Sequence, residues 1–305
     1  MNNIKVLSDY IKAVTKNVVI DNTIELDLVL SGGAFNGMFG LGNILFIKQL
    51  EREKKINVNR VSGCSVGAVL GLVYLTDNFD ETNNVFNNLK NCLKEKGNLK
   101  CLKNIIVEGV NNIFKTDEEM KEQINGRLYI NYNDISDCNY CVISEYDNKE
   151  HLIECLLRSM YIPFLIDGNL KIDDKYIDGI VPYIFKNSSR KILYLEMMKD
   201  YTDIIKCVVT QNEKNQHYRI LQGVTDASRF FTNGRSERLT WYEDWNTIKI
   251  IKHNILYLSA MIIVVFIDFL SSINIPSIIC NNKLYKLSST VIIKSCKDIL
   301  GKLNY

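Results

Sequence analysis

Residues 26–75 read LDLVLSGGAFNGMFGLGNILFIKQLEREKKINVNRVSGCSVGAVLGLVYL, and the rest of the 305-residue chain is organised around them. An apolar run ends at Leu30, and a Ser-Gly-Gly turn follows it. Residues 39–54 then carry apolar side chains at helical spacing. A second short strand ends at Val61, and a glycine-flanked turn leads at once into the apolar helix 68–75. This order predicts a βαβα unit with both tight turns at the same edge of a parallel sheet.

The second turn, Gly63-Cys64-Ser65-Val66-Gly67, has the G-x-S-x-G pattern of a nucleophile elbow. A serine on such a strand-to-helix turn presents its hydroxyl outside the sheet, and the flanking glycines avoid collisions with the neighbouring strand and helix. The N-terminus of the helix that follows favours negative charge near the serine. The pattern therefore predicts that Ser65 is a nucleophile, with a plain tight turn as the alternative.

The first turn contains the backbone donors that a serine nucleophile needs. Attack on an ester carbonyl produces an oxyanion, which requires fixed N–H groups beside the serine. Gly32 and Gly33, followed by the small Ala34, allow the backbone to turn its amides toward that point. The amide of Val66 adds a donor from the elbow. Both turns together predict an oxyanion hole.

These turns resemble two motifs of the patatin-like phospholipase family, and two more segments extend the likeness. Residues 30–37 (LSGGAFNG) are similar to the family's glycine-rich oxyanion loop, and residues 63–67 are similar to its serine elbow. Residues 158–163 (RSMYIP) are similar to its Ser-x-x-Ile-Pro approach segment, and Asp178-Gly179-Ile180 is similar to its Asp-Gly-Gly/Ala motif.

The resemblance implies a three-layer α/β/α hydrolase core that cleaves acyl esters of lipids with a Ser-Asp dyad, without a histidine, a metal or a cofactor. An aspartate at the end of a hairpin can accept the serine proton as a general base. The expected site consists of the catalytic Ser65 and Asp178, the oxyanion-hole residues Gly32, Gly33, Ala34 and Val66, and the motif-supporting Gly37, Gly63, Gly67 and Gly179.

The chain departs from the family pattern at three positions. Ala34 replaces a third glycine, and Asn36 replaces the usual basic residue of the loop. Ile180 stands where glycine or alanine is usual. We expect Asn36 to remove a charge that helps to hold the loop or a phosphate, and Ile180 to crowd a turn close to the dyad.

Composition places the chain among intracellular globular proteins. A net charge of +2 and the lack of a basic stretch interleaved with aromatic residues argue against nucleic acid as a partner. Residues 1–16 contain no continuous apolar segment of the kind found in signal peptides. The nine scattered cysteines are interpreted as reduced thiols of a cytoplasmic protein. Cys138 and Cys141 form a C-x-x-C without partners for a metal, and are interpreted as unrelated thiols.

Periodicity predicts further elements outside residues 26–75. A hairpin that turns near Asp173 and Asp174 is expected to deliver Asp178 at its end. The remaining expectations are helices over 8–16, 150–160 and 217–231, and strands over 140–144, 191–197 and 204–210.

Two regions leave alternatives open, one within an expected catalytic domain of residues 1–247 and one after it. Residues 77–125 are expected to form several short helices inserted into the core, either as a lid or acyl-binding cap or as an ordinary helical layer. Residues 248–305 form an apolar extension. Its stretch 255–267 follows Lys249, Lys252 and His253, so it is either membrane-associated (through residues 255–270) or packed on the catalytic layer.

The sequence therefore predicts a lipid acyl hydrolase that acts through an acyl-enzyme at a membrane surface. The resemblance implies phospholipids or glycerides as substrates. One alternative is a Ser-Asp-His esterase that uses His217 or His253. The other is a catalytically silent lipid-binding protein with the same fold.

Overall fold

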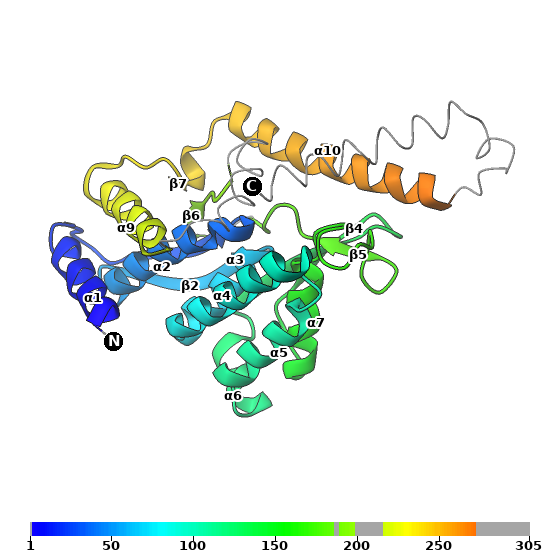
Figure 1. The fold of residues 1–305 in the computed structure, drawn as a ribbon. Helices are drawn as coiled ribbons and strands as arrows, with labels where there is room; N and C mark the ends of the chain where they lie inside the picture. The colour runs from blue at the N-terminus through cyan, green and yellow to red at the C-terminus, as the bar shows by residue number, and fades with distance from the viewer. Residues whose placement is uncertain (1, 186–188, 199–215, 273–305) are drawn as a thin grey trace, which may run out of the picture.

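The computed structural model describes residues 2–185, 189–198 and 216–272. Within them a seven-stranded mixed sheet forms the centre of the molecule, in the order β4-β3-β2-β1-β6-β7, with β5 pairing to β3 (Figure 1). The strands are β1 Ile24–Leu30, β2 Ile56–Gly63, β3 Leu128–Asp134, β4 Asn139–Ile143, β5 Tyr176–Asp178, β6 Lys191–Leu195 and β7 Leu239–Trp241.

The predicted βαβα unit forms the middle of this sheet. β1 runs parallel to β2 and to β6, and β2 runs parallel to β3. Because neighbouring parallel strands end at the same edge, the turns that follow β1 and β2 lie side by side. Strands β4, β5 and β7 are antiparallel to their neighbours and extend the sheet at its two sides.

One face of the sheet is covered by most of the helices. Leu26, Leu28 and Leu30 of β1 contribute to the main hydrophobic core there, with residues of α2, α3, α7 and α9. The helices in the described residues are α1 Asn2–Thr15, α2 Gly37–Arg52, α3 Val66–Thr76, α4 Phe79–Lys96, α5 Leu102–Ile113, α6 Asp117–Ile124, α7 Lys149–Ser159, α9 Gln216–Asn233 and α10 Thr247–Ser272.

The opposite face has a thinner cover. Val29, Ile192 and Tyr194 point to this side, where they pack against Phe185 and Trp245. His253 near the start of α10 contacts the rings of Tyr194 and Trp245. The helices and the mixed sheet thus confirm the predicted α/β fold, with α10 and the segment 181–185 forming the third layer.

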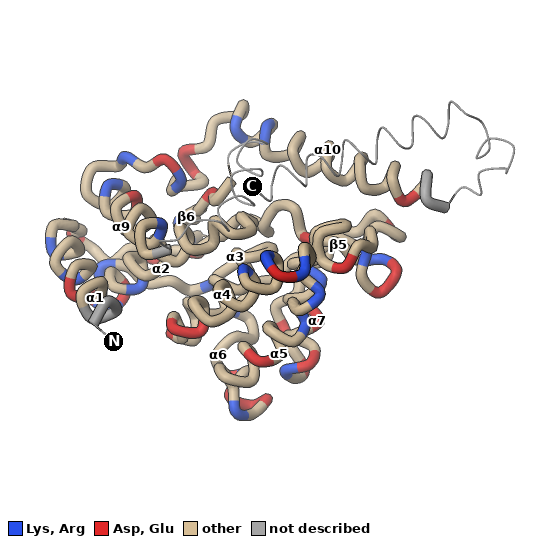
Figure 2. The backbone as a smooth tube through the Cα atoms, in the orientation of Figure 1, with Lys and Arg blue, Asp and Glu red and all other residues tan. Residues whose placement is uncertain are grey.

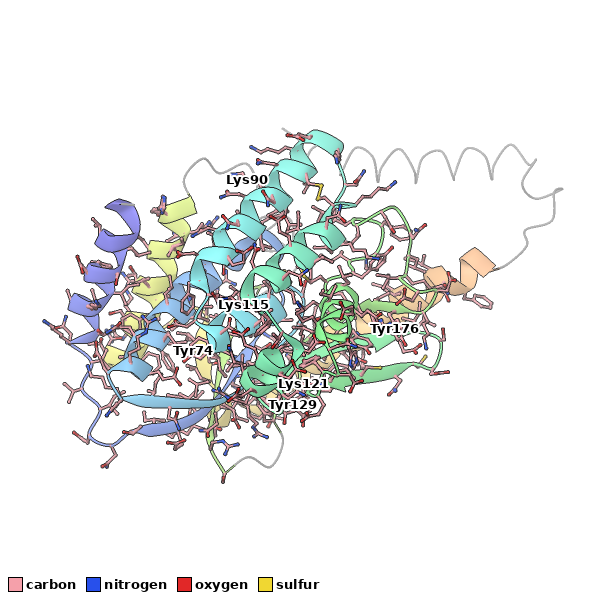
Figure 3. All side chains as sticks on the ribbon, turned by 90° about the horizontal axis from the view of Figure 1, so that it is seen from below. Tyr74, Lys90, Lys115, Lys121, Tyr129 and Tyr176 are labelled. Carbon is pink, nitrogen blue, oxygen red and sulfur yellow. A yellow bond between two sulfur atoms is a disulfide. The ribbon has the colours of Figure 1, made fainter. Side chains whose placement is uncertain are left out.

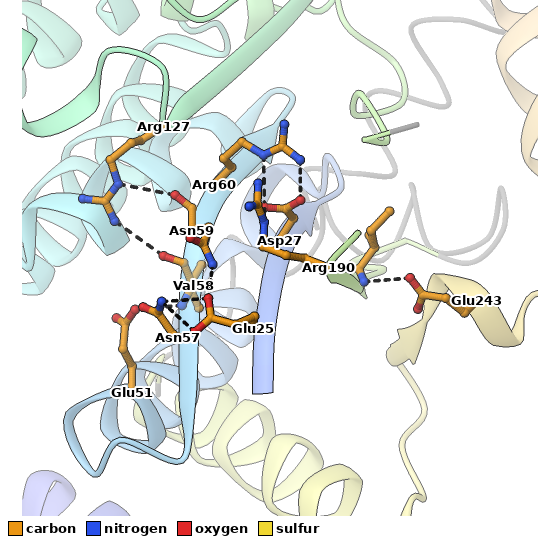
Figure 4. Close-up of polar contacts among 11 residues, drawn as sticks. Glu25, Asp27, Glu51, Asn57, Val58, Asn59, Arg60, Arg127, Arg190 and Glu243 are labelled. Atoms are coloured by element: carbon orange, nitrogen blue, oxygen red, sulfur yellow. Dashed lines mark hydrogen bonds and ion pairs between the residues drawn. The ribbon is translucent and has the colours of Figure 1, made fainter. Parts of the chain in front are cut away.

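A buried ion cluster stabilises the centre of the sheet on this second face (Figure 4). The carboxylate of Asp27 in β1 is fully buried and accepts hydrogen bonds from Arg60 of β2 and from Arg190. Arg60 also lies over the ring of Phe185. An unpaired buried carboxylate would destabilise the folded protein, so Asp27 needs the two arginines as partners. Asp27 therefore has a structural role and takes no part in the predicted site.

Most of the expected elements are present. The expected strands at 140–144 and 191–197 correspond to β4 and β6, and the helices at 150–160 and 217–231 correspond to α7 and α9. Strands β3 and β7 were not predicted. The inserted region contains α4, α5 and α6, of which α4 is 18 residues long rather than short. The strand expected at 204–210 lies outside the described residues.

The interpretation of all cysteines as reduced thiols is wrong for one pair. Cys92 near the end of α4 and Cys101 before α5 form a disulfide, which Figure 3 shows as a yellow bond. The turn between the helices brings their Cα atoms to 6.5 Å, within the range that a disulfide spans. Cys64, Cys138, Cys141 and Cys155 are free thiols.

Helix α10 extends beyond the uninterrupted apolar stretch 255–267 at both ends. The segment Thr247–Phe269 is long and apolar enough to cross a membrane by length and composition, and little of it is buried. Figure 2 shows basic residues at its start, an acidic residue near its end and neither kind between them. The expected packing on the catalytic layer is present on one face of the helix, through Met261 and its neighbours, and membrane association stays a prediction.

Candidate active site

Ser65 occupies a sharp turn between β2 and α3. Its backbone has φ 53° and ψ −131°, a conformation that non-glycine residues rarely adopt and that is found at strained functional turns. A Cβ at Gly63 would lie 2.3 Å from the Gly67 carbonyl oxygen, and one at Gly67 would lie 2.4 Å from that of Leu30. Both positions of the elbow therefore admit only glycine.

The glycine-rich loop after β1 lies directly beside this elbow. A Cβ at Gly32 would be 3.4 Å from the Cβ of Ser65. Met197, two residues after β6, holds the loop at two points. Its N–H donates to Ser31 Oγ (2.7 Å), and its carbonyl oxygen accepts from Asn36 Nδ2 (2.8 Å). Asn36 thus helps to hold the loop through a neutral hydrogen bond in place of the missing charge.

Three of the four predicted oxyanion-hole amides are available as donors. Within the described residues, the N–H groups of Gly33, Ala34 and Val66 make no hydrogen bond. The N–H of Gly32 instead faces the Cys64 sulfur and acts to lower the pKa of that thiol, which burial raises. Ala34 has φ 44°, so it adopts the left-handed conformation for which glycine is preferred.

Strand β5 brings Asp178 next to the elbow. The pairing of β2 with β3 ends at Gly63 and Ile130, and β5 takes up the same side of β3 two residues later, with Asp178 opposite Tyr132. The end of β5 therefore lies in line with the end of β2, where Ser65 follows. The predicted turn forms at Asp173 and Asp174, although its hairpin is a single bridge and β5 pairs mainly with β3.

The Asp178 carboxylate has one free oxygen. Oδ1 accepts from the N–H of Ile180 (2.7 Å), whereas the buried Oδ2 makes no hydrogen bond in the described part of the chain. Burial raises the pKa of Asp178 to about 6, and the Ile180 N–H and the Ser65 hydroxyl act in the opposite direction. A free carboxylate oxygen beside a serine hydroxyl is the acceptor that a general base needs.

The approach segment connects the two candidate residues. Buried Ser159, at the end of α7, accepts the N–H of Ser65 with its carbonyl oxygen (3.1 Å) and with its Oγ (3.0 Å). Two residues later, the Tyr161 carbonyl accepts the N–H of Asp178 (2.9 Å). Sequence reasoning assigned Ser159 no role of its own. Its position three residues before Ile162, in the Ser-x-x-Ile-Pro pattern, is the signal that could have marked it.

An apolar cavity of about 70 Å³ opens at Ser65. Its walls come from the oxyanion loop, from α3 to α5 and from the approach segment, so the inserted helices form part of it. The lining residues are Ala34, Phe35, Gly37, Ser65, Val66, Val69, Leu70, Thr82, Val85, Phe86, Leu89, Leu99, Leu102, Met160, Ile162, Leu165 and Ile166. The remaining predicted residue, Gly179, packs against Asn131 and Cys64.

The histidines do not support a Ser-Asp-His triad. His151 pairs with Asp147, His253 packs against Tyr194 and Trp245, and His217 is exposed at the start of α9. No histidine lines the cavity at Ser65. In the part of the chain that the structure describes, no three His, Cys, Asp or Glu side chains gather closely enough to hold a metal ion.

Comparison with known proteins agrees with this geometry. Residues 28–98 match the family model of the patatin-like phospholipases. The match contains the oxyanion loop and the serine elbow and ends before Asp178. No curated protein matches the chain. The predicted resemblance to the patatin-like phospholipase family is thereby confirmed, while the role of each site residue stays a prediction.

Proposed function

We propose that this protein, with its patatin-like fold, hydrolyses acyl esters of lipids with Ser65 as nucleophile and Asp178 as general base. One observation supports this most: a strained serine at the mouth of an apolar cavity lies beside a buried carboxylate with one unbonded oxygen. The apolar lining of the cavity suits the hydrocarbon of an acyl chain. In this proposal residues 1–247 form the catalytic unit, and α4 and α5 form an acyl-binding cap.

The reaction follows in two steps. Asp178 Oδ2 takes the proton of Ser65 as Oγ bonds to the acyl carbon, and the oxyanion is held by the amides of Gly33, Ala34 and Val66. The carbonyl re-forms as the bond to the alcohol breaks, and the alcohol leaves with the proton from Asp178. Water then loses a proton to Asp178 and attacks the acyl-serine, which releases the fatty acid and restores the Ser65 hydroxyl.

The activity is tested with fluorogenic phospholipid and glyceride substrates in vesicles and with soluble p-nitrophenyl butyrate. Turnover of the soluble ester and of at least one lipid is the expected result. Vesicle binding without turnover of any ester would instead identify a silent lipid-binding protein. Comparison of the two lipid substrates decides between a phospholipase and a glyceride hydrolase.

We expect kcat/KM for p-nitrophenyl butyrate to rise with pH and to level off above an apparent pKa near 6, because only ionised Asp178 can accept the serine proton. A pH profile from about pH 4.5 to about pH 9 measures this limb. A rate that stays level down to about pH 4.5, as a base with the ordinary aspartate pKa of about 3.9 would give, would contradict a buried Asp178 base with a raised pKa.

Narrowing the cavity is expected to change the preferred acyl chain. Leu89 of α4 lines the cavity and is half-buried, so Leu89→Trp should fill space without disrupting the core. We expect octanoyl esters to lose about tenfold in kcat/KM while acetyl esters are nearly unaffected. Asn88→Trp, on the adjacent exposed position, is the matched control. An equal loss of kcat/KM for octanoyl and acetyl esters would show that the cavity does not bind the acyl chain.

We propose that α10 holds the enzyme at an intracellular membrane surface. Its exposed face carries Ile255, Leu258, Ile262, Ile263, Phe266 and Phe269, and Lys249 and Lys252 stand at its start, where they can meet lipid headgroups. Asp268 forms a salt bridge with Lys171 of the catalytic domain (2.8 Å). Since this contact keeps the end of α10 beside the domain, a position in the plane of the membrane surface is favoured over a span.

A further inference from the structure

Helix α10 contacts the turn that carries Asp178. Its residues Tyr257, Met261, Val264 and Asp268 recur at intervals of four, three and four, and therefore lie on one face of the helix. Asp268 pairs with Lys171, as described above. The other three residues of this face reach the neighbourhood of Asp178 by an apolar and a polar route.

The apolar route runs through Ile180. Met261, with Tyr257 and Val264, packs in one small cluster with Ile177 and Ile180, the residues on either side of the Asp178-Gly179 step. The N–H of Ile180 donates to Asp178 Oδ1 (2.7 Å). A shift of the Ile180 side chain therefore moves the backbone donor that orients the carboxylate.

The polar route runs through Asn133 of β3. The hydroxyl of Tyr257 donates to Asn133 Oδ1 (3.0 Å), and Asn133 Nδ2 donates to the backbone carbonyl of Asp178 (2.7 Å). Asn133 is fully buried, so it cannot exchange these partners for water. Tyr257 is also fixed by an edge-on ring contact with Tyr140.

The backbone conformation of Ile180 is strained and depends on these contacts. Its φ of 63° is strained for a β-branched residue, and such strain persists only where the surrounding contacts impose it. Glycine would relieve the strain but would lack the side chain that reaches α10. The isoleucine that departs from the family pattern thus packs against the cluster that joins Met261 of α10 to Ile177 beside Asp178.

We propose that α10 is a brace for the catalytic aspartate, and that Tyr257, Asn133 and Ile180 are positioning residues through which it orients Asp178. The functional half of this inference rests on the proposed role of Asp178. In this arrangement the helix that meets lipid through its outer face holds the general base through its inner face.

The test uses the full chain and the soluble ester p-nitrophenyl butyrate, so that membrane binding does not enter the measurement. Tyr257→Phe removes the hydroxyl that meets Asn133, and Met261→Ala removes the side chain that packs on Ile180. Ile251→Ala, at an exposed position of α10 outside the proposed membrane face, is the matched control. We expect kcat to fall roughly tenfold in the first two variants with KM nearly unchanged, since misplacing a catalytic group lowers the rate of the chemical step.

The pH profile separates positioning from a loss of folded protein. Besides Ser65, the titratable group facing Asp178 is the Cys64 thiol, which in turn faces Tyr140 of β4. Because the Ile180 N–H lowers the pKa of Asp178, loosening it should move the acid limb of Met261→Ala to higher pH. Met261→Leu, which restores the apolar contact, should return the limb toward the wild-type position.

Amide hydrogen exchange gives a readout that does not depend on activity. We expect faster exchange at Ile180 in Tyr257→Phe and Met261→Ala, and wild-type exchange in Ile251→Ala. Unchanged exchange and an unchanged acid limb in both α10 variants would overturn the brace. Faster exchange in the two α10 variants, together with a wild-type protein that lacks esterase activity, would instead leave the brace in place and refute the proposed function.

Discussion

Ser65→Ala is expected to lower kcat/KM for acyl esters by about 10⁴-fold and to leave the fold intact. The substitution removes the Oγ that forms the acyl-enzyme. The shape of the turn is kept, because Gly63 and Gly67 set its backbone and Ser159 still accepts the N–H of residue 65. Steady-state kinetics with p-nitrophenyl butyrate measures the loss, and circular dichroism checks the fold.

Ser62→Ala is the matched control for this experiment. Ser62 is a fully buried serine of β2, three residues before Ser65, and its Oγ has no hydrogen-bond partner in the described structure. We expect this variant to keep its activity, and its free energy of unfolding should not fall, because no hydrogen bond is lost. Activity that survives in Ser65→Ala would place the nucleophile elsewhere.

Asp178→Asn is expected to lower kcat by about 10³-fold and at the same time to stabilise the folded protein at neutral pH. Burial raises the pKa of Asp178 from 3.8 to about 6, so the ionised form destabilises the native state by about 3 kcal/mol above pH 6. The native state binds more protons than the unfolded state between these two pKa values. Stability therefore falls as pH rises through this window, and asparagine, which does not titrate, avoids the loss.

Chemical denaturation at two pH values measures the second effect. The difference in unfolding free energy between Asp178→Asn and wild type should be largest above about pH 6 and should shrink toward pH 4, where both carboxyl and amide are neutral. Asp174→Asn, at the exposed turn before β5, should change neither rate nor stability. A difference in unfolding free energy of the same size at both pH values would contradict the raised pKa of Asp178.

The parts of the fold that were predictable are those encoded by short-range patterns. The elbow and the oxyanion loop are recognisable because each needs glycine at a fixed place, and the crossover helix α2 follows from its apolar spacing. These patterns depend on contacts between residues close in sequence. For that reason β1, β2 and the helices between and after them were obtained with nearly correct bounds.

The features that were missed depend on distant partners. β3 reads as Leu-Tyr-Ile-Asn-Tyr-Asn-Asp, and its buried Asn131 and Asn133 look like loop residues until they are seen to bind the backbone at 178–181. The disulfide requires the turn between α4 and α5, and the three-residue β7 is defined only by its pairing with β6. None of these features appears in the sequence as a regular spacing of apolar residues.

The contacts seen in the structure change the interpretation of two departures from the family pattern. Asn36 was expected to leave the loop less well held, yet it donates to the end of β6. Ile180 was expected only to crowd its turn, yet it packs against a cluster that contains Met261 of α10. Substitutions beside a site are therefore best judged by what the new side chain touches.

The most direct test of the central claim is covalent labelling of the wild-type chain with a fluorophosphonate, followed by intact mass and peptide mapping. The account predicts one adduct, on Ser65, which forms faster as pH rises through about 6 and is absent in Ser65→Ala. An unlabelled wild-type protein, or an adduct on another residue, would contradict it.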